Sequence, residues 1–89
     1  MIEHTITIIN KRGLHARAAA KLATTSGRFA ASIQAGINER MVDSKSVMSL
    51  MLLAATQGTP LHLNIDGVDE SEALCAICDL INDMFGEGE

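Results

Sequence analysis

The apolar residues of this chain switch repeatedly between two spacings, and the order of the switches restricts the fold more than any other feature. An apolar residue at every second position indicates a strand with one buried face, whereas a spacing of three or four indicates an amphipathic helix. Strand spacing is found in residues 2–9, 29–35, 40–42 and 60–66, and helix spacing in residues 16–26, 47–54 and 69–85.

The resulting order is strand, helix, strand, strand, helix, strand, helix. An antiparallel four-stranded sheet with three helices packed on one face satisfies this order, so we predict an α+β fold of the open-faced sandwich type. The 89 residues suit a single domain that spans 1–89. Only Phe29 and Phe85 are aromatic, so the core has to be built from aliphatic side chains, methionine and alanine.

Several residues are predicted to begin or end these elements. Gly27 is placed to end the first helix in a left-handed conformation, Gly36 to turn the first hairpin, and Ser46 to cap the second helix. Asp69 with Glu72 predicts a capping box at the start of the last helix. The inner face of that helix is predicted to contain Leu74, Ile77, Cys78, Ile81 and Phe85, and the acidic tail 86–89 to fray.

The charge of the chain limits its partners. A formal net charge of −4 argues against a nucleic-acid partner, which needs a clustered basic face. Polar residues interrupt every apolar run before the about 18 residues of a membrane span, and no leader precedes the first strand, so we expect no membrane insertion and a cytoplasmic location. Five basic residues still cluster early in the chain and indicate a small anion or an acidic protein surface: Lys11, Arg12, Arg17, Lys21 and Arg28.

One histidine, His15, stands where strand spacing gives way to helix spacing. A helix start has backbone N–H groups without an intrahelical partner and carries partial positive charge. An anion on His15 would meet the amides of Ala16, Arg17 and Ala18 and the Arg17 guanidinium, a setting that suits a phosphohistidine. The alternative is that His15 is only a polar neighbour of a helix start, because no Asp, Cys or second His lies close in sequence.

Two further sets of residues have both a chemical and a structural interpretation. Cys75 and Cys78 form a C-x-x-C motif, but they lie inside a helical pattern without a second cysteine pair, so we interpret them as structural thiols. His4 and His62 lie in strand patterns and are interpreted as surface residues. We therefore predict neither a metal nor a cofactor.

Three stretches, in order along the chain, resemble the HPr family, the histidine phosphocarriers of the bacterial phosphotransferase system, and their NPr relatives. Asn10–Arg17 resembles the active-site segment, Asp43–Met51 the regulatory-serine helix, and Asp66–Leu74 the opening of the last helix. The resemblance covers essentially all 89 residues. Family members usually have proline where this chain has Ala18, and proline there removes only a donor that is unpaired anyway, so alanine should keep the helix.

The resemblance implies a monomeric carrier rather than an enzyme. A phosphoryl group would pass from phospho-enzyme I to Nδ1 of His15 and on to an enzyme II A domain in sugar transport, with Arg17 neutralising its charge. Ser46 would be phosphorylated by an HPr kinase/phosphorylase, and Ser44 is a weaker candidate. The implied partner-binding residues are Ala20, Val47, Met48 and Met51.

Alternatives to this interpretation stay open. Within the family, the chain can be a regulatory carrier for nitrogen or carbon control that translocates no sugar. From another class, it can be a small α+β interaction domain in which His15 is incidental. For residues 47–54, the alternative to partner contact is burial, but six large apolar side chains are more than one helix face buries.

Overall fold

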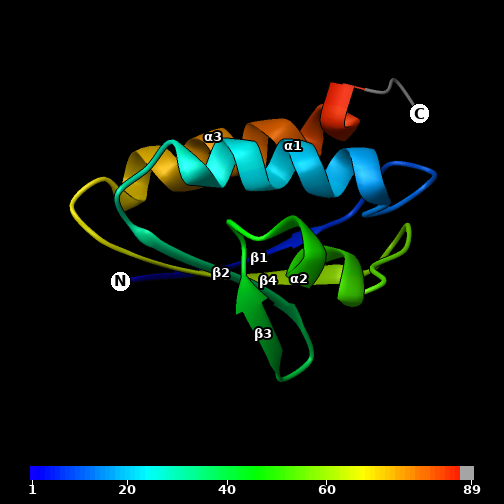
Figure 1. The fold of residues 1–89 in the computed structure, drawn as a ribbon, viewed down its shortest axis with the longest axis horizontal. Coiled ribbons are helices and arrows are strands. Elements are labelled where there is room, and N and C mark those ends of the chain that lie inside the picture. The colour runs from blue at the N-terminus through cyan, green and yellow to red at the C-terminus, as the bar shows by residue number, and fades with distance from the viewer. Residues whose placement is uncertain (87–89) are drawn as a thin grey trace.

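The computed structural model describes residues 1–86 and contains the predicted order of elements (Figure 1). The prediction of a frayed tail covers residues 86–89, of which 87–89 lie outside the described residues. Gly86 is described, and its N–H donates to the Asp83 carbonyl at 2.9 Å. The strands are β1 (Ile2–Thr7), β2 (Ser32–Ile37), β3 (Arg40–Asp43) and β4 (Pro60–Asp66). The helices are α1 (Ala16–Gly27), α2 (Val47–Leu52) and α3 (Glu70–Asn82), followed by the short 3₁₀ helix η1 (Met84–Gly86).

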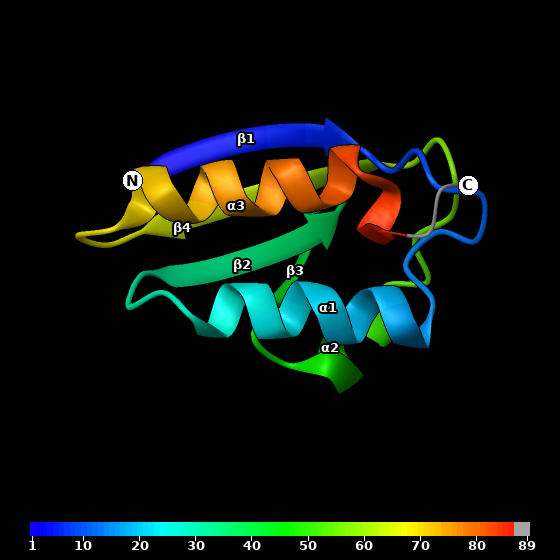
Figure 2. The same cartoon turned by 90° about the horizontal axis from the view of Figure 1, so that it is seen from above.

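The four strands form one antiparallel sheet in the order β1-β4-β2-β3. Helices α1 and α3 lie side by side over one face of this sheet (Figure 2), and α2 packs against α1 and β3. In β4, Leu61, Leu63 and Ile65 are buried while the residues between them are more exposed, so the strand turns its apolar side towards the helices. The predicted fold class is confirmed.

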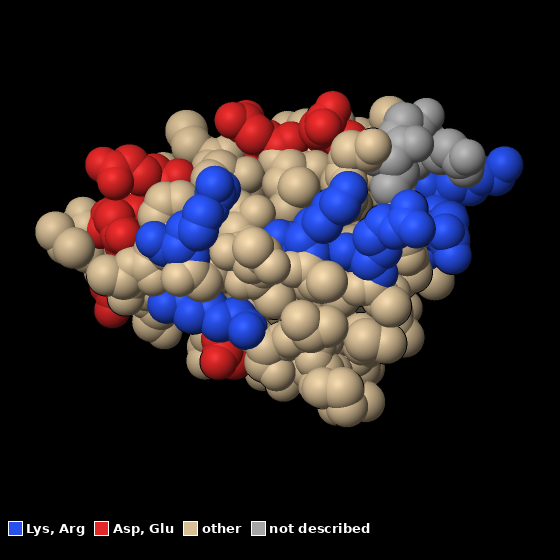
Figure 3. Space-filling view, turned by 45° about the horizontal axis from the view of Figure 1, so that its top comes forward, with Lys and Arg blue, Asp and Glu red and all other residues tan. Residues whose placement is uncertain are grey.

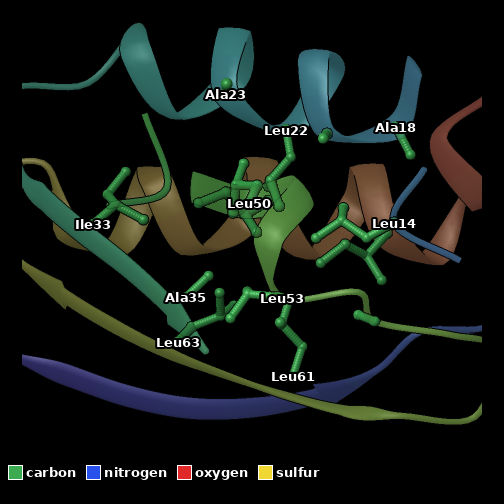
Figure 4. Packing of buried hydrophobic residues seen from close by; sticks show 14 of the residues in the cluster. Leu14, Ala18, Leu22, Ala23, Ile33, Ala35, Leu50, Leu53, Leu61 and Leu63 are labelled. Carbon is green, nitrogen blue, oxygen red and sulfur yellow. The ribbon is translucent and has the colours of Figure 1, made fainter. Parts of the chain in front are cut away.

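The core lies between the sheet and the helices. Figure 4 shows Leu22 of α1 beside Leu50 of α2, above Leu61 and Leu63 of β4. All four side chains are fully buried. Burial of one such leucine contributes about 1.5–3 kcal/mol, so a core of this kind does not need many aromatic rings. The small buried residues Ala18, Ala19 and Ala23 leave room for these leucines along α1.

Two glycines have other roles than predicted. Gly27 does not end α1 in a left-handed conformation, because the helix closes at Arg28 with right-handed geometry and the Arg28 N–H donates to the Thr25 carbonyl at 3.2 Å. Gly36 is not a turn residue either, because it lies within β2 opposite Met41. A Cβ atom there would come within 2.1 Å of the Arg40 carbonyl oxygen, so the absence of a side chain at Gly36 allows β2 and β3 to approach each other closely.

The predicted capping box at α3 is wrong. Asp69 precedes the helix, but its carboxylate oxygens accept the N–H groups of Ala30 and Ala31, at 2.8 and 2.9 Å, in the loop after α1. Chiefly because the Ala30 N–H donates to it, the pKa of the Asp69 carboxyl lies below its usual value. Glu72 is exposed, and Glu70 accepts the Gly67 N–H instead. The carboxylate therefore joins α3 to the end of α1.

The remaining differences concern the ends and inner faces of elements. The first strand ends at Thr7 instead of residue 9, and α2 ends at Leu52 instead of residue 54. On α3, the buried residues include Ala73, whereas Leu74 and Cys78 are only half-buried. Both shortened elements end where the chain enters the loops that hold the candidate site.

Candidate functional site

The loop between β1 and α1 is held by the loop between α2 and β4. The Ile8 N–H donates to the Thr59 carbonyl at 3.0 Å, and the Gly58 N–H donates to the Ile8 carbonyl at 2.7 Å. Further along, the Leu14 N–H donates to the Ala55 carbonyl at 2.9 Å. These backbone bonds fix both ends of the loop that leads to His15.

Gly13 allows the loop before α1 to lie directly against the loop between α2 and β4. Its φ is +64°, and a Cβ atom there would lie 2.3 Å from the Ala55 carbonyl oxygen and 2.8 Å from the Cα of Thr56. The turn around it is closed by Asn10, whose carbonyl accepts the Gly13 N–H and whose side-chain amide donates to the Gly13 carbonyl at 2.8 Å. Sequence reasoning missed both roles, although the spacing of Asn10 and Gly13 is typical of a turn.

His15 occupies the N-cap position of α1. Its backbone is extended, with φ −75° and ψ 179°, and its carbonyl accepts the Ala19 N–H as the first bond of the helix. The imidazole is half-buried and makes no capping hydrogen bond to the helix. The amides of Ala16, Arg17 and Ala18 belong to the first turn, where α-helical geometry provides no carbonyl partner. The structure thus places the predicted histidine at the positive end of a helix.

The surface around this helix start is basic. Arg17, Lys11 and Arg12 are all exposed, and the first turn of α1 contains no acidic side chain. Figure 3 shows a band of Lys and Arg side chains across the face that α1 presents. Most of the acidic side chains in that view lie along its upper edge and at its left end. An anion at His15 would therefore meet favourable charge from the backbone and from the surrounding side chains.

Helix α2 presents an apolar surface to solvent. Met48 is 73% exposed, Leu52 63%, Met51 43% and Val47 37%; we call these four residues the α2 patch. The inner face of the same region consists of Leu50 and Leu53, both buried. The sequence predicted three members of the patch and missed Leu52. The predicted helix was longer, whereas the six-residue α2 buries only Leu50 and leaves Leu52 in solvent. Ala20 of α1 is half-buried.

The serines before α2 have different roles. Ser46 caps the helix as predicted, since its Oγ accepts the Ser49 N–H at 3.3 Å, and it is only half-buried. Ser44 is fully buried, and its hydroxyl lies 2.8 Å from that of Ser26 in α1. The weaker phosphorylation candidate is therefore inaccessible in this structure.

The other candidate side chains lie apart from this region. Cys75 is exposed and Cys78 half-buried on α3, and burial raises the pKa of the Cys78 thiol. On the sheet, His62 Nδ1 lies 2.9 Å from the hydroxyl of Thr5. Within residues 1–86 no group of three or more His, Cys, Asp or Glu side chains is arranged to hold a metal ion. Over the same residues, no helix is long and apolar enough to cross a membrane.

Residues 2–83 match the family described as "PTS HPr component phosphorylation site". The chain belongs to the HPr family. Phosphocarrier protein HPr of Pseudomonas aeruginosa is 55% identical over 85 residues, which are 94% of each chain. The crystal structure of HPr-C-His from Thermoanaerobacter tengcongensis has a TM-score of 0.93 at 44% identity, and the match covers 98% of both chains.

Among the relatives compared, the chain is more similar to HPr proteins than to an NPr. Phosphocarrier protein NPr of Shewanella violacea is 41% identical over 86 residues, covering 97% of this chain and 94% of its own. The HPr of Pseudomonas aeruginosa is more similar, at 55%. The chain is thus a phosphocarrier of the phosphotransferase system, and the alternative of an unrelated interaction domain is not supported.

The contact at Gly13 can be tested with a matched pair of glycines. Gly13→Ala should lower the free energy of unfolding by about 3 kcal/mol, because a methyl group there meets backbone atoms that cannot move independently. Gly58→Ala in the facing loop also has positive φ but meets no atom within 4 Å, so it should cost only about 1 kcal/mol. Urea denaturation measures both, and equal losses would contradict the role given to Gly13.

Proposed function

We propose that His15 accepts a phosphoryl group on Nδ1 from phosphorylated enzyme I and passes it to an enzyme II A domain. The observation that carries this proposal is the N-cap position of His15, at a helix start held by Gly13 and flanked by Arg17. In this proposal residues 1–89 act as one domain in the cytoplasm. The chain is a co-substrate of two transfer reactions, not an enzyme.

The chemistry asks for positioning and charge stabilisation. In the neutral imidazole with its proton on Nε2, the Nδ1 lone pair attacks phosphorus while the bond from phosphorus to the donor breaks. Negative charge on the transferred oxygens is met by the amides of Ala16, Arg17 and Ala18 and by the Arg17 guanidinium. Because Arg17 is exposed, water weakens its attraction for the phosphate, which suits a group that has to leave again.

Docking of both partners is assigned to the α2 patch with Ala20. The patch is apolar and half of it is methionine, whose flexible side chain adapts to partners of different shape. Donor and acceptor would use the same surface in turn, since each must bring its phosphoryl site to the same histidine. An exposed apolar area beside the reactive group is the expected form of such a surface.

We assign regulation to Ser46, as a substrate of an HPr kinase/phosphorylase. Its hydroxyl is half-buried at the start of α2, directly before Val47 and Met48 of the α2 patch. A phosphate adds about −1.5 to −2 charge, which the helix start favours but an apolar interface has to desolvate. Modification would thus leave the helix intact and weaken docking.

The central experiment is phosphorylation by enzyme I and phosphoenolpyruvate, followed by mass spectrometry. The unchanged protein should gain one phosphate, and His15→Ala should gain none while keeping its fold, because a half-buried residue at a helix start contributes little to packing. His62→Ala, on the sheet, is the matched control and should still be phosphorylated. A phosphate on His15→Ala would refute the assignment.

The regulatory proposal is tested by placing the same negative charge at two helix starts. Ser46→Asp should raise the dissociation constant for enzyme I about tenfold, a loss of about 1.4 kcal/mol of binding energy at the edge of the docking surface. Ser71→Asp adds the charge in the first turn of α3, outside the docking surface, and should leave affinity unchanged. Calorimetric titration measures both; equal affinities would leave Ser46 as a helix cap only.

A further inference from the structure

The two cysteines of the chain lie on the outer surface of α3, away from the sheet and from α1. At about 100° per residue, Cys75 lies about 160° around the helix from the buried Ile77, and Cys78 lies about 100° from it. Cys75 is accordingly exposed and Cys78 half-buried. Leu80 lines a pocket together with residues of α1, and both cysteines lie at least about 140° around the helix from it. A purely structural role therefore does not fit Cys75.

The spacing of the cysteines makes their side chains neighbours. Residues three apart on a helix have Cβ atoms about 5–6 Å from each other. The pKa of the Cys78 thiol lies above its usual value, first because burial disfavours the thiolate, and then because Cys75 and Asp79 add negative charge beside it. The Cys78 thiol is therefore protonated at neutral pH and is a weak nucleophile.

The helix holds the two cysteines too far apart for a relaxed disulfide. A disulfide needs Cβ atoms about 3.5–4.5 Å apart, closer than neighbours on a helix. Cys75 lies more than one turn after Glu70, the first residue of α3, so closing this gap would deform regular helix on both sides of the pair. An ion inserted between the two sulfur atoms needs no such approach. With sulfur–metal bonds of about 2.3 Å, two sulfur atoms on opposite sides of an ion lie about 4.5 Å apart.

The surroundings of the pair limit which ion can be inserted. Thiolates are soft ligands, which favour Cu(I) and Zn²⁺. Zn²⁺ takes four ligands, and within residues 1–86 no third His, Cys, Asp or Glu side chain joins the two thiols in a metal-binding arrangement. Cu(I) needs only two thiolates, placed in line on either side of it. Glu72 and Asp79 lie one turn before and one turn after Cys75, and their charge attracts a cation.

We propose that Cys75 and Cys78 form a two-thiolate site for Cu(I) on the outer face of α3. Each thiol gives up its proton and forms one sulfur–copper bond. One Cu⁺ ion thus replaces two protons and leaves the pair with a single negative charge. No residue of the proposed phosphoryl-transfer site takes part, and both cysteines face away from α1. The inference therefore goes beyond the proposed function and stands independently of phosphate on His15.

Competition with a chromogenic Cu(I) chelator tests the proposal. Cu(I) is added without oxygen, as its acetonitrile complex, to the reduced full chain in the presence of bathocuproine disulfonate. The unchanged protein should retain one copper ion per chain, seen also by native mass spectrometry. Cys75→Ser and Cys78→Ser should each weaken binding at least about a hundredfold, because a single thiol cannot chelate the ion. His62→Ala removes an imidazole from the sheet and should bind copper like the unchanged protein. Equal affinities of Cys75→Ser and the unchanged protein would overturn the proposal.

A matched variant tests whether the two thiols have to face each other. Cys75→Ser/Ala76→Cys keeps two thiols but places them two residues apart, about 160° from each other around α3. It should bind copper as weakly as Cys75→Ser, while circular dichroism checks that the helices are intact. Affinity equal to that of the unchanged protein would show that any two cysteines suffice and would reject the site. So would an unchanged protein that retains no copper and instead loses the mass of two hydrogens, as in disulfide formation.

Discussion

The start of α1 depends on one close approach between two backbone segments. Gly13 lies so near Ala55 that no side chain fits between them, and the Leu14 N–H donates to the Ala55 carbonyl. Residues 53–59 connect α2 to β4, so this contact brings the end of α2, the start of α1 and the start of β4 together. A partner that covers the α2 patch can therefore reach His15 without any rearrangement of the fold.

A carrier has to hold a phosphoryl group firmly enough to receive it and loosely enough to release it. In the proposed mechanism the backbone amides hold the phosphoryl group firmly, because the first turn of α1 is fixed by the Gly13 contact and by a buried face of alanine and leucine. The exposed Arg17 would add a weaker, solvent-screened attraction. In the proposed mechanism, binding energy comes instead from the α2 patch beside the site, which gains nothing from the phosphate itself.

Several features set by neighbouring residues were predictable from the sequence, whereas features set by distant contacts were not. Strand 60–66 and the Ser46 cap follow from local spacing, and the structure contains both. Asp69 was misassigned because its partner, the loop at Ala30, comes close only in the folded chain. Gly36 was misassigned although its partner Arg40 is near in sequence, because β2 continues to Ile37 and the turn follows at residues 38–39. The candidate site shows the same division. The motif around His15 indicated that this residue lies at a helix start. Position 13 needs a glycine because its backbone approaches Ala55, which is far along the chain.

Long-range ¹H–¹⁵N spectra of the phosphorylated protein show directly where the phosphoryl group is held, because they report the imidazole nitrogens and the backbone amides together. Phosphorus should be bonded to Nδ1 of His15, and the amides of Ala16, Arg17 and Ala18 should shift far more than those at the start of α3. Phosphate on another residue or on Nε2, or α1 amides that do not respond, would contradict this assignment.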